Sequence, residues 1–166
     1  MTTTPIQGVW KLLSFQFYIK GNDKNPLFSP LGDKPSGRIM FTSEGYMNAT
    51  LTSSDVLEPS DQPQWALAED DYILNVARPM TTYCGPFKLV NEGGKQLLKT
   101  KVDLALDPNW IGGYQVREWE LRRENDNDFL VLRPLQTFPG PDGKELVGVL
   151  LWEKINKDVA PVKASL

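Results

Sequence analysis

Apolar and polar residues alternate with a period of two along most of this chain, which is the pattern of β-strands. The first alternating stretch, Gly8–Ile19, reads GVWKLLSFQFYI. Further stretches lie at about 38–42, 46–52, 82–90, 96–106, 114–124, 129–133 and 145–155, and turn-forming residues separate most of them. Sequential strands linked mostly by hairpins predict an all-β, antiparallel up-and-down barrel of about eight strands. A flat or two-layer sheet is the alternative.

The second and third stretches are predicted to form a hairpin, because Ser43-Glu44-Gly45 between them is a turn sequence. This turn pairs Thr42 with Tyr46 and so sorts the hairpin into two faces. One face carries Arg38, Met40, Thr42, Tyr46, Asn48 and Thr50, and the other carries Ile39, Phe41, Met47, Ala49 and Leu51. On periodicity alone, the apolar second face is the one expected in the core.

One helical pattern interrupts the strands. The run ALAEDDYILNVAR, residues 66–78, has acidic residues near its start and ends before Pro79. The whole chain has 166 residues, which suits a single domain spanning 1–166. The tail after Asn156 is predicted to be loose.

The residue types that are missing exclude several kinds of chemistry. The chain has no histidine and one cysteine, Cys84, so neither a histidine-based catalytic triad nor a transition-metal site is expected. No glycine-rich phosphate loop occurs, and we expect no cofactor. A net charge of −3 argues against a nucleic-acid partner, and no apolar run is long enough to predict a membrane span. The single thiol and the absence of a signal-peptide pattern predict a cytoplasmic location.

Several segments resemble those of a known family. Gly8-Val9-Trp10 resembles the Gly-x-Trp signature of lipocalins. The runs GVWKLLSF, PLGDKPSGRIMFTSEGYMNATL, LALDPNWIGGYQVREWEL and GVLLWEKI resemble, in order, segments of the small lipocalin-like domain proteins of bacteria and fungi. The resemblance covers about Gly8–Ile155 and departs in the connection 53–81. It implies a calyx-like barrel, and some fungal members act in natural-product pathways as cofactor-free cyclases or isomerases.

The resemblance also implies which face of the first strand points inward. In lipocalin-type barrels the signature Trp points into the barrel, and a period of two then places Leu12, Ser14, Gln16 and Tyr18 inside with Trp10. Consistency extends this interpretation to the hairpin, where it places Arg38, Met40, Tyr46 and Asn48 in the cavity. The row Leu13, Phe15, Phe17 and Ile19 would then point outward. Such a row needs cover from the helix or from a second subunit, so a homo-oligomer is expected.

The stretch 114–124 separates into an outward and an inward set. Tyr114, Val116, Glu118, Glu120 and Arg122 look solvated, with the two glutamates facing Lys99 and Lys101. The inward set is then Gln115, Arg117 and Trp119. A confined guanidinium needs a partner or a ligand, and Asp103 is one candidate partner. The alternative is that Arg117 is a structural plug of the barrel.

A pocket of this composition suits a small, hydrophobic, oxygenated ligand. The expected substrate-binding residues are Gln16, Tyr18, Arg38, Met40, Asn48, Gln115 and Trp119, and the expected catalytic residues are Arg117, Asp103 and Tyr46. The first hypothesis is a cofactor-independent cyclase or isomerase of a polyketide- or terpenoid-derived molecule. A non-catalytic carrier of a hydrophobic molecule and an interaction module with a solid barrel are the rivals. A titratable group facing the cavity beside Arg117 would separate the catalyst from the carrier.

Overall fold

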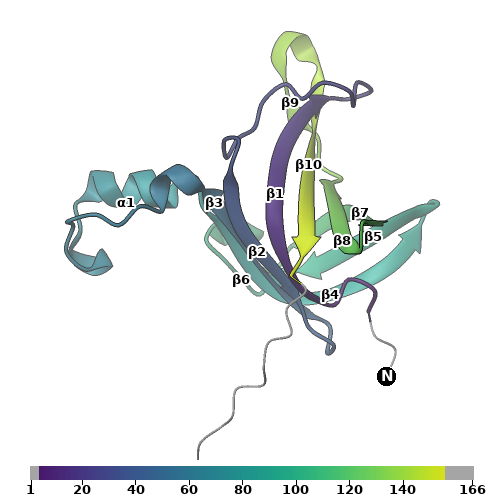
Figure 1. Ribbon diagram of the computed structural model, residues 1–166, viewed down its shortest axis with the longest axis horizontal. Helices are drawn as coiled ribbons and strands as arrows, with labels where there is room; N and C mark the ends of the chain where they lie inside the picture. The colour runs from purple at the N-terminus through teal and green to yellow at the C-terminus, as the bar shows by residue number, and fades with distance from the viewer. Residues whose placement is uncertain (1–3, 156–166) are drawn as a thin grey trace, which may run out of the picture.

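The computed structural model describes residues 4–155, and the tail after Asn156 lies outside the described residues. Eight strands close into an antiparallel barrel in the order β1-β2-β3-β4-β5-β7-β8-β10, with β10 pairing back to β1 (Figure 1). Two short strands are additional. The strands are β1 (Gly8–Ile19), β2 (Pro35–Phe41), β3 (Tyr46–Ser53), β4 (Thr81–Glu92), β5 (Lys95–Lys101), β6 (Leu104–Ala105), β7 (Tyr114–Glu124), β8 (Asn127–Pro134), β9 (Phe138–Pro139) and β10 (Glu145–Lys154). The expected barrel is therefore confirmed.

The two ends of the barrel are built differently. Tight turns join β2 to β3, β4 to β5 and β7 to β8 at one end, which we call the turn end. The connections 20–34, 54–80, 102–113 and 135–144 lie at the other end, which we call the loop end. Trp10 closes the turn end: its side chain is fully buried, and its Nε1–H donates to the carbonyl of Ile6 at 2.8 Å.

A β-bulge in β1 exchanges the two faces of that strand halfway along it. Leu12 pairs with Trp152 but Ser14 pairs with Leu151, so Leu13 is an extra residue without an opposite partner. Trp10 and Leu12 point inward as expected. Beyond the bulge the expectation is wrong. The inward residues there are Phe15 and Phe17, whereas Ser14, Gln16 and Tyr18 point outward.

The hairpin β2–β3 has the predicted turn and register, but its apolar face is the inner one. The pairing between β1 and β2 shows why. Trp10 lies opposite Ile39, and residues that lie opposite each other share a face of the sheet, so an inward Trp10 requires an inward Ile39. The expectation from periodicity is confirmed, and the inverted interpretation of Arg38, Met40, Tyr46 and Asn48 as cavity residues is wrong.

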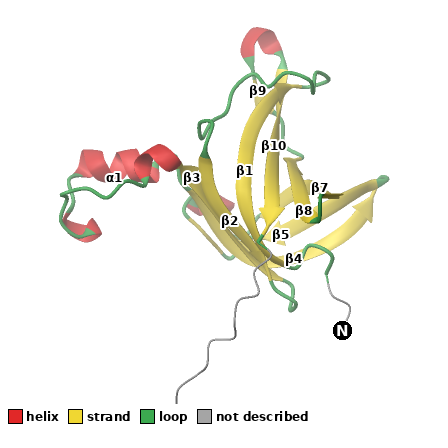
Figure 2. Ribbon diagram, in the orientation of Figure 1, coloured by secondary structure: helices red, strands yellow, loops and turns green. Residues whose placement is uncertain are grey.

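The helix α1 (Asp70–Ala77) projects from the side of the barrel instead of covering it (Figures 1 and 2). It follows the 3₁₀ turns η1 (Ser54–Val56) and η2 (Trp65–Leu67), and it has no buried residue. The other 3₁₀ turns are η3 (Pro108–Trp110) and η4 (Pro141–Gly143). The apolar row that the helix was expected to cover lies inside the barrel after the bulge. The homo-oligomer therefore loses its argument and stays a prediction.

The middle and the turn end of the barrel interior are packed with large apolar side chains. Leu12, Ile39, Phe41, Met47, Leu98, Leu130, Leu132 and Trp152 are each at most 3% exposed. Toward the loop end the inward residues become half-buried, as at Phe15, Arg117 and Trp119. Solvent therefore reaches the interior at these three residues, whereas Phe17, Leu51 and Leu146, which lie closer to the loop end, are at most 8% exposed.

Candidate functional site

Arg117 and Gln115 face the interior of the barrel near the loop end, as the sequence predicts. Arg117 lies opposite Leu98 on β5, which is 1% exposed, and opposite Pro134, the last residue of β8. Its Nη2 donates to Oε1 of Gln115 at 3.0 Å, and its Nη1 donates to the carbonyl of Val116 at 3.1 Å. Within residues 4–155 the guanidinium has no ion-pair partner. Its positive charge is therefore left for solvent or a bound anion to neutralise.

Two indole N–H groups lie deeper on the same inner face. Trp119 lies opposite Leu132, one step below Arg117 along the sheet, and Trp152 lies opposite Leu130, one step further. The Nε1 atoms of both tryptophans are buried and have no hydrogen-bond partner among the described residues. Indole and guanidinium groups can donate hydrogen bonds but cannot accept them. The interior therefore offers hydrogen-bond donors at three successive levels, and these donors need oxygen atoms as acceptors.

Aromatic rings line the loop end at β1. Phe17 stacks on Phe28 from the connection 20–34, with 5.1 Å between ring centroids, and meets Phe138 edge-on at 5.2 Å. Phe15 packs against Phe17 at 5.2 Å. Gly148 lies opposite Phe17, and a Cβ there would come within 3.2 Å of the Phe15 ring. These rings give the loop end an apolar wall.

The expected catalytic pair of Tyr46 and Asp103 does come together, but on the outer surface of the barrel. The Tyr46 hydroxyl lies 3.2 Å from Oδ2 of Asp103 and 3.5 Å from Sγ of Cys84. The hydrogen bond with Cys84, partial burial and the hydrogen bond with Asp103 together raise the pKa of Tyr46 well above its usual value. The phenol therefore stays protonated near neutral pH. Because this group lies outward, Asp103 does not partner Arg117, and that expectation is wrong.

Gln16 and Tyr18 line a cavity of about 740 Å³, but this cavity lies on the outer face of β1, β8 and β10. The Tyr18 hydroxyl donates to Oε1 of Gln16 at 2.8 Å, above a floor that includes Val131, Val147 and Val149. Most of the charged groups beside it are already paired. The contacts are Lys95 with Glu118, and both Arg122 and Arg133 with Glu120, whose pKa is lowered chiefly by the hydrogen bond from Arg122.

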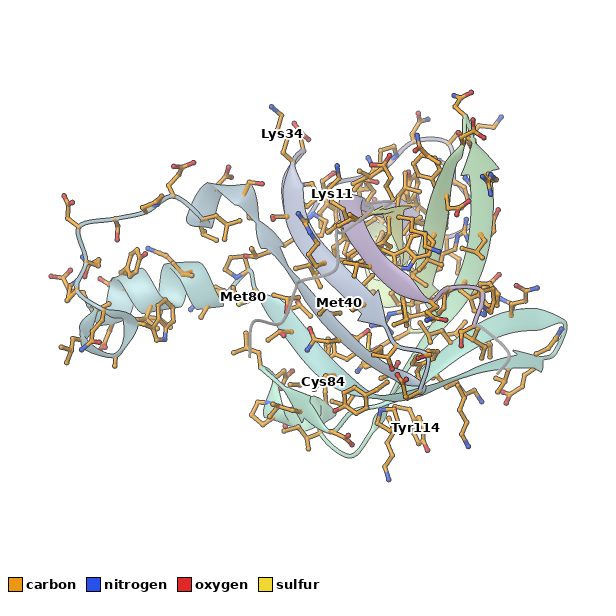
Figure 3. All side chains as sticks on the ribbon, turned by 60° about the horizontal axis from the view of Figure 1, so that its bottom comes forward. Lys11, Lys34, Met40, Met80, Cys84 and Tyr114 are labelled. Atoms are coloured by element: carbon orange, nitrogen blue, oxygen red, sulfur yellow. The ribbon has the colours of Figure 1, made fainter. Side chains whose placement is uncertain are left out.

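The remaining expected ligand contacts also lie outside the barrel. Arg38 donates to the neighbouring Gly37 carbonyl at 2.8 Å, and Asn48 lies opposite Cys84 on the outer face. Met40 is 43% exposed on β2 (Figure 3). None of these three can touch a ligand held with Arg117 inside the barrel.

Two inward residues, Trp152 and Tyr83, are not among the site residues that the sequence predicts. Trp152 is 1% exposed, and the alternation Leu146, Gly148, Leu150, Trp152 carries the signal that could have found it. Tyr83 is 7% exposed on the inner face of β4, opposite Ala49, and its ring meets Trp110 edge-on at 5.5 Å. Its phenol is thus a polar group on an inward side chain.

A closed antiparallel barrel of eight strands can enclose one small ligand. The comparison with family models agrees: the model described as a lipocalin-like domain matches residues 7–155. The chain belongs to the lipocalin-like domain family, and a barrel of this family suits the binding of a small hydrophobic molecule. No curated protein matches the sequence.

Among residues 4–155, no group of three or more metal-ligating side chains is placed to hold a metal ion. The same part of the chain contains no helix that is both long and apolar enough to cross a membrane.

Proposed function

We propose that this protein carries a small, hydrophobic, oxygen-bearing molecule in the loop end of its barrel. The observation that supports the proposal is the pair of inward donors Arg117 and Trp119, for which residues 4–155 provide too few acceptors. Burying a donor without an acceptor is costly, and a ligand that brings a carboxylate, carbonyl or phenolate oxygen removes that cost. The rings of Phe15 and Phe17 would pack against its apolar part.

Replacing Arg117 with alanine tests this proposal. The probe is 8-anilinonaphthalene-1-sulfonate, an apolar anion whose fluorescence rises on binding. A charge-assisted contact contributes about 2–3 kcal/mol, so we expect Arg117→Ala to weaken the affinity by about 30- to 150-fold. Trp119→Phe keeps an aromatic ring, removes one donor and should have a smaller effect in the same direction.

The matched control is Arg38→Ala, which removes the same side chain from the outer face of β2. We expect this variant to bind the probe like the parent protein. If Arg117→Ala binds the probe equally well but unfolds at lower urea concentration, Arg117 is a structural plug and the proposal fails.

Catalysis beside the same inward donors is the second candidate. A cofactor-free cyclase or isomerase of a polyketide- or terpenoid-derived molecule needs a group that transfers a proton near the developing negative charge. The inward phenol of Tyr83 supports this candidate, with Arg117 as the group that stabilises the charge. Tyr46 and Asp103 do not support it, because they face outward.

Native mass spectrometry of the protein from its own organism, followed by denaturation and extraction, separates the two candidates. For a carrier we expect one molecule, recovered in stoichiometric amount and unchanged when fresh protein is added. Two isomers of equal mass that interconvert with the parent protein, but not with Tyr83→Phe, would instead establish the isomerase. The same spectrum counts the subunits and so tests the predicted homo-oligomer.

A further inference from the structure

A separate cavity of about 560 Å³ lies on the outer face of the sheet formed by β4, β5 and β7. Its floor includes Pro86, Val90 and Val116. Tyr114, which is 63% exposed, projects from the outer side of this sheet (Figure 3). The volume lies within the range of about 300–1,000 Å³ that is common for small-molecule sites. None of these residues belongs to the loop-end site.

Three lysines, Lys88, Lys99 and Lys101, surround this apolar floor. Lys88 and Lys99 lie directly opposite each other on β4 and β5, and like charges in that position repel. Lys101 lies on the same face two residues after Lys99. The chain as a whole has a net charge of −3, so this concentration of positive charge is a local feature and not a general one.

The neighbouring carboxylates leave most of this charge unpaired. Lys99 contacts Glu92 at 2.6 Å, and Glu118 on β7 pairs with Lys95, not with Lys99 or Lys101 as the sequence predicts. In the part of the chain that the structure describes, neither Lys88 nor Lys101 has an ion-pair partner. No carboxylate lines the cavity itself.

We propose that this groove binds an amphipathic anion, namely a carboxylate that carries a hydrocarbon chain. Its carboxylate lies between Lys88 and Lys101, which are diagonal neighbours in the register and so suited to share one anion. Tyr114 lies opposite Lys101 and brings its hydroxyl to the same end. The hydrocarbon lies on Val90 and Val116, beside the methylene stem of Lys99.

Titration with decanoate below its micellar concentration tests the proposal, with NMR shifts of the valine methyl groups as the readout. We expect saturable shifts at Val90 and Val116. The double variant Lys88→Met/Lys101→Met keeps the aliphatic stems and removes both charges, and it should weaken decanoate binding at least tenfold. Lys34→Met is the control, because Lys34 is exposed just before the β2 strand, far from Tyr114 (Figure 3). It should bind decanoate normally.

Further measurements distinguish this site from its rivals. Decanol has the same chain without the charge and should bind at least tenfold more weakly than decanoate. Arg117→Ala should leave the shifts at Val90 and Val116 intact, so the experiment tests the groove independently of the loop-end site. Unchanged decanoate affinity in the double lysine variant would overturn the proposal. So would equally tight binding of a hexaglutamate peptide, since the groove would then recognise acidic segments and not apolar carboxylates.

Discussion

Trp10→Ala is expected to lower the free energy of unfolding by about 3–5 kcal/mol. The indole is fully buried at the turn end of the barrel, so its removal leaves a cavity that the surrounding strands can close only in part. The substitution also removes the hydrogen bond from Nε1 to the carbonyl of Ile6, a residue that is itself fully buried. A buried carbonyl without a donor adds to the cost. Urea denaturation followed by circular dichroism measures the change.

Two further variants make this result interpretable. Trp65→Ala removes the same side chain from the projecting segment that carries α1, where Trp65 is 52% exposed, and we expect a change of less than about 1 kcal/mol. Trp10→Phe keeps most of the ring volume but loses the hydrogen bond to Ile6. It should lie between the two alanine variants. Equal stabilities of Trp10→Ala and Trp65→Ala would show that Trp10 does not hold the turn end together.

The strands and the hairpin register could be predicted because short-range chemistry determines them. The turn Ser43-Glu44-Gly45 joins its two strands directly, so the pairing of Met40 with Asn48 follows from the loop length. The pairing of β1 with β2 is a different case, because fifteen residues, 20–34, separate the two strands. Nothing local shows that Trp10 lies opposite Ile39. Once that pair is known, the inner face of the hairpin follows at once.

The bulge at Leu13 could not be predicted for a physical reason. Leu12 and Leu13 are both apolar, so either of them can face the core, and the composition of the strand does not show which parity holds afterwards. A slip of one residue exchanges the two faces of the strand, and for this reason Gln16 and Tyr18 were expected inside. Phe15 and Phe17 hold the inner positions because they bury more apolar area there.

The loop-end site was partly predictable because β7 has two faces of contrasting character. Glu118, Glu120 and Arg122 form ion pairs on the outer face, so Gln115, Arg117 and Trp119 had to face inward. Tyr46 and Asp103 were expected to act together inside the barrel. They do contact each other, but on its outer surface. Asp103 follows the end of β5, where the chain turns across β4, and its amide donates to the Cys84 carbonyl at 2.9 Å on the outer side.

The segment after β5 crosses β4 closely, and this crossing leads to the second large effect. Gly85→Ala is expected to destabilise the protein by about 3 kcal/mol or more. A Cβ on Gly85 would lie 1.8 Å from the carbonyl oxygen of Lys101 and 3.2 Å from the amide nitrogen of Asp103. These are backbone atoms, so they cannot move aside by changing a rotamer. The segment is also tied down, because the Leu106 amide donates to the Thr82 carbonyl at 2.9 Å.

The control for this prediction is Gly113→Ala, where the nearest contact of an added Cβ is an ordinary 3.4 Å from the Trp110 carbonyl. Gly113 lies in the same connection between β5 and β7, and its substitution should change stability by about 1 kcal/mol or less. Urea denaturation of both variants gives the comparison. If Gly85→Ala is as stable as Gly113→Ala, the close crossing of β4 by the end of β5 is wrong.

The same substitution connects the fold to the proposed anion site. To admit a methyl group at Gly85, the backbone of Lys101 must move away from β4, and this carries its ammonium group away from Lys88. A Gly85→Ala protein that still folds should therefore bind decanoate more weakly. It should keep its affinity for 8-anilinonaphthalene-1-sulfonate at Arg117, because β7 and β8 hold that residue independently. Loss of both affinities would mean that the change has spread through the whole barrel, whereas loss of decanoate binding alone would place the two sites on separately supported parts of one sheet.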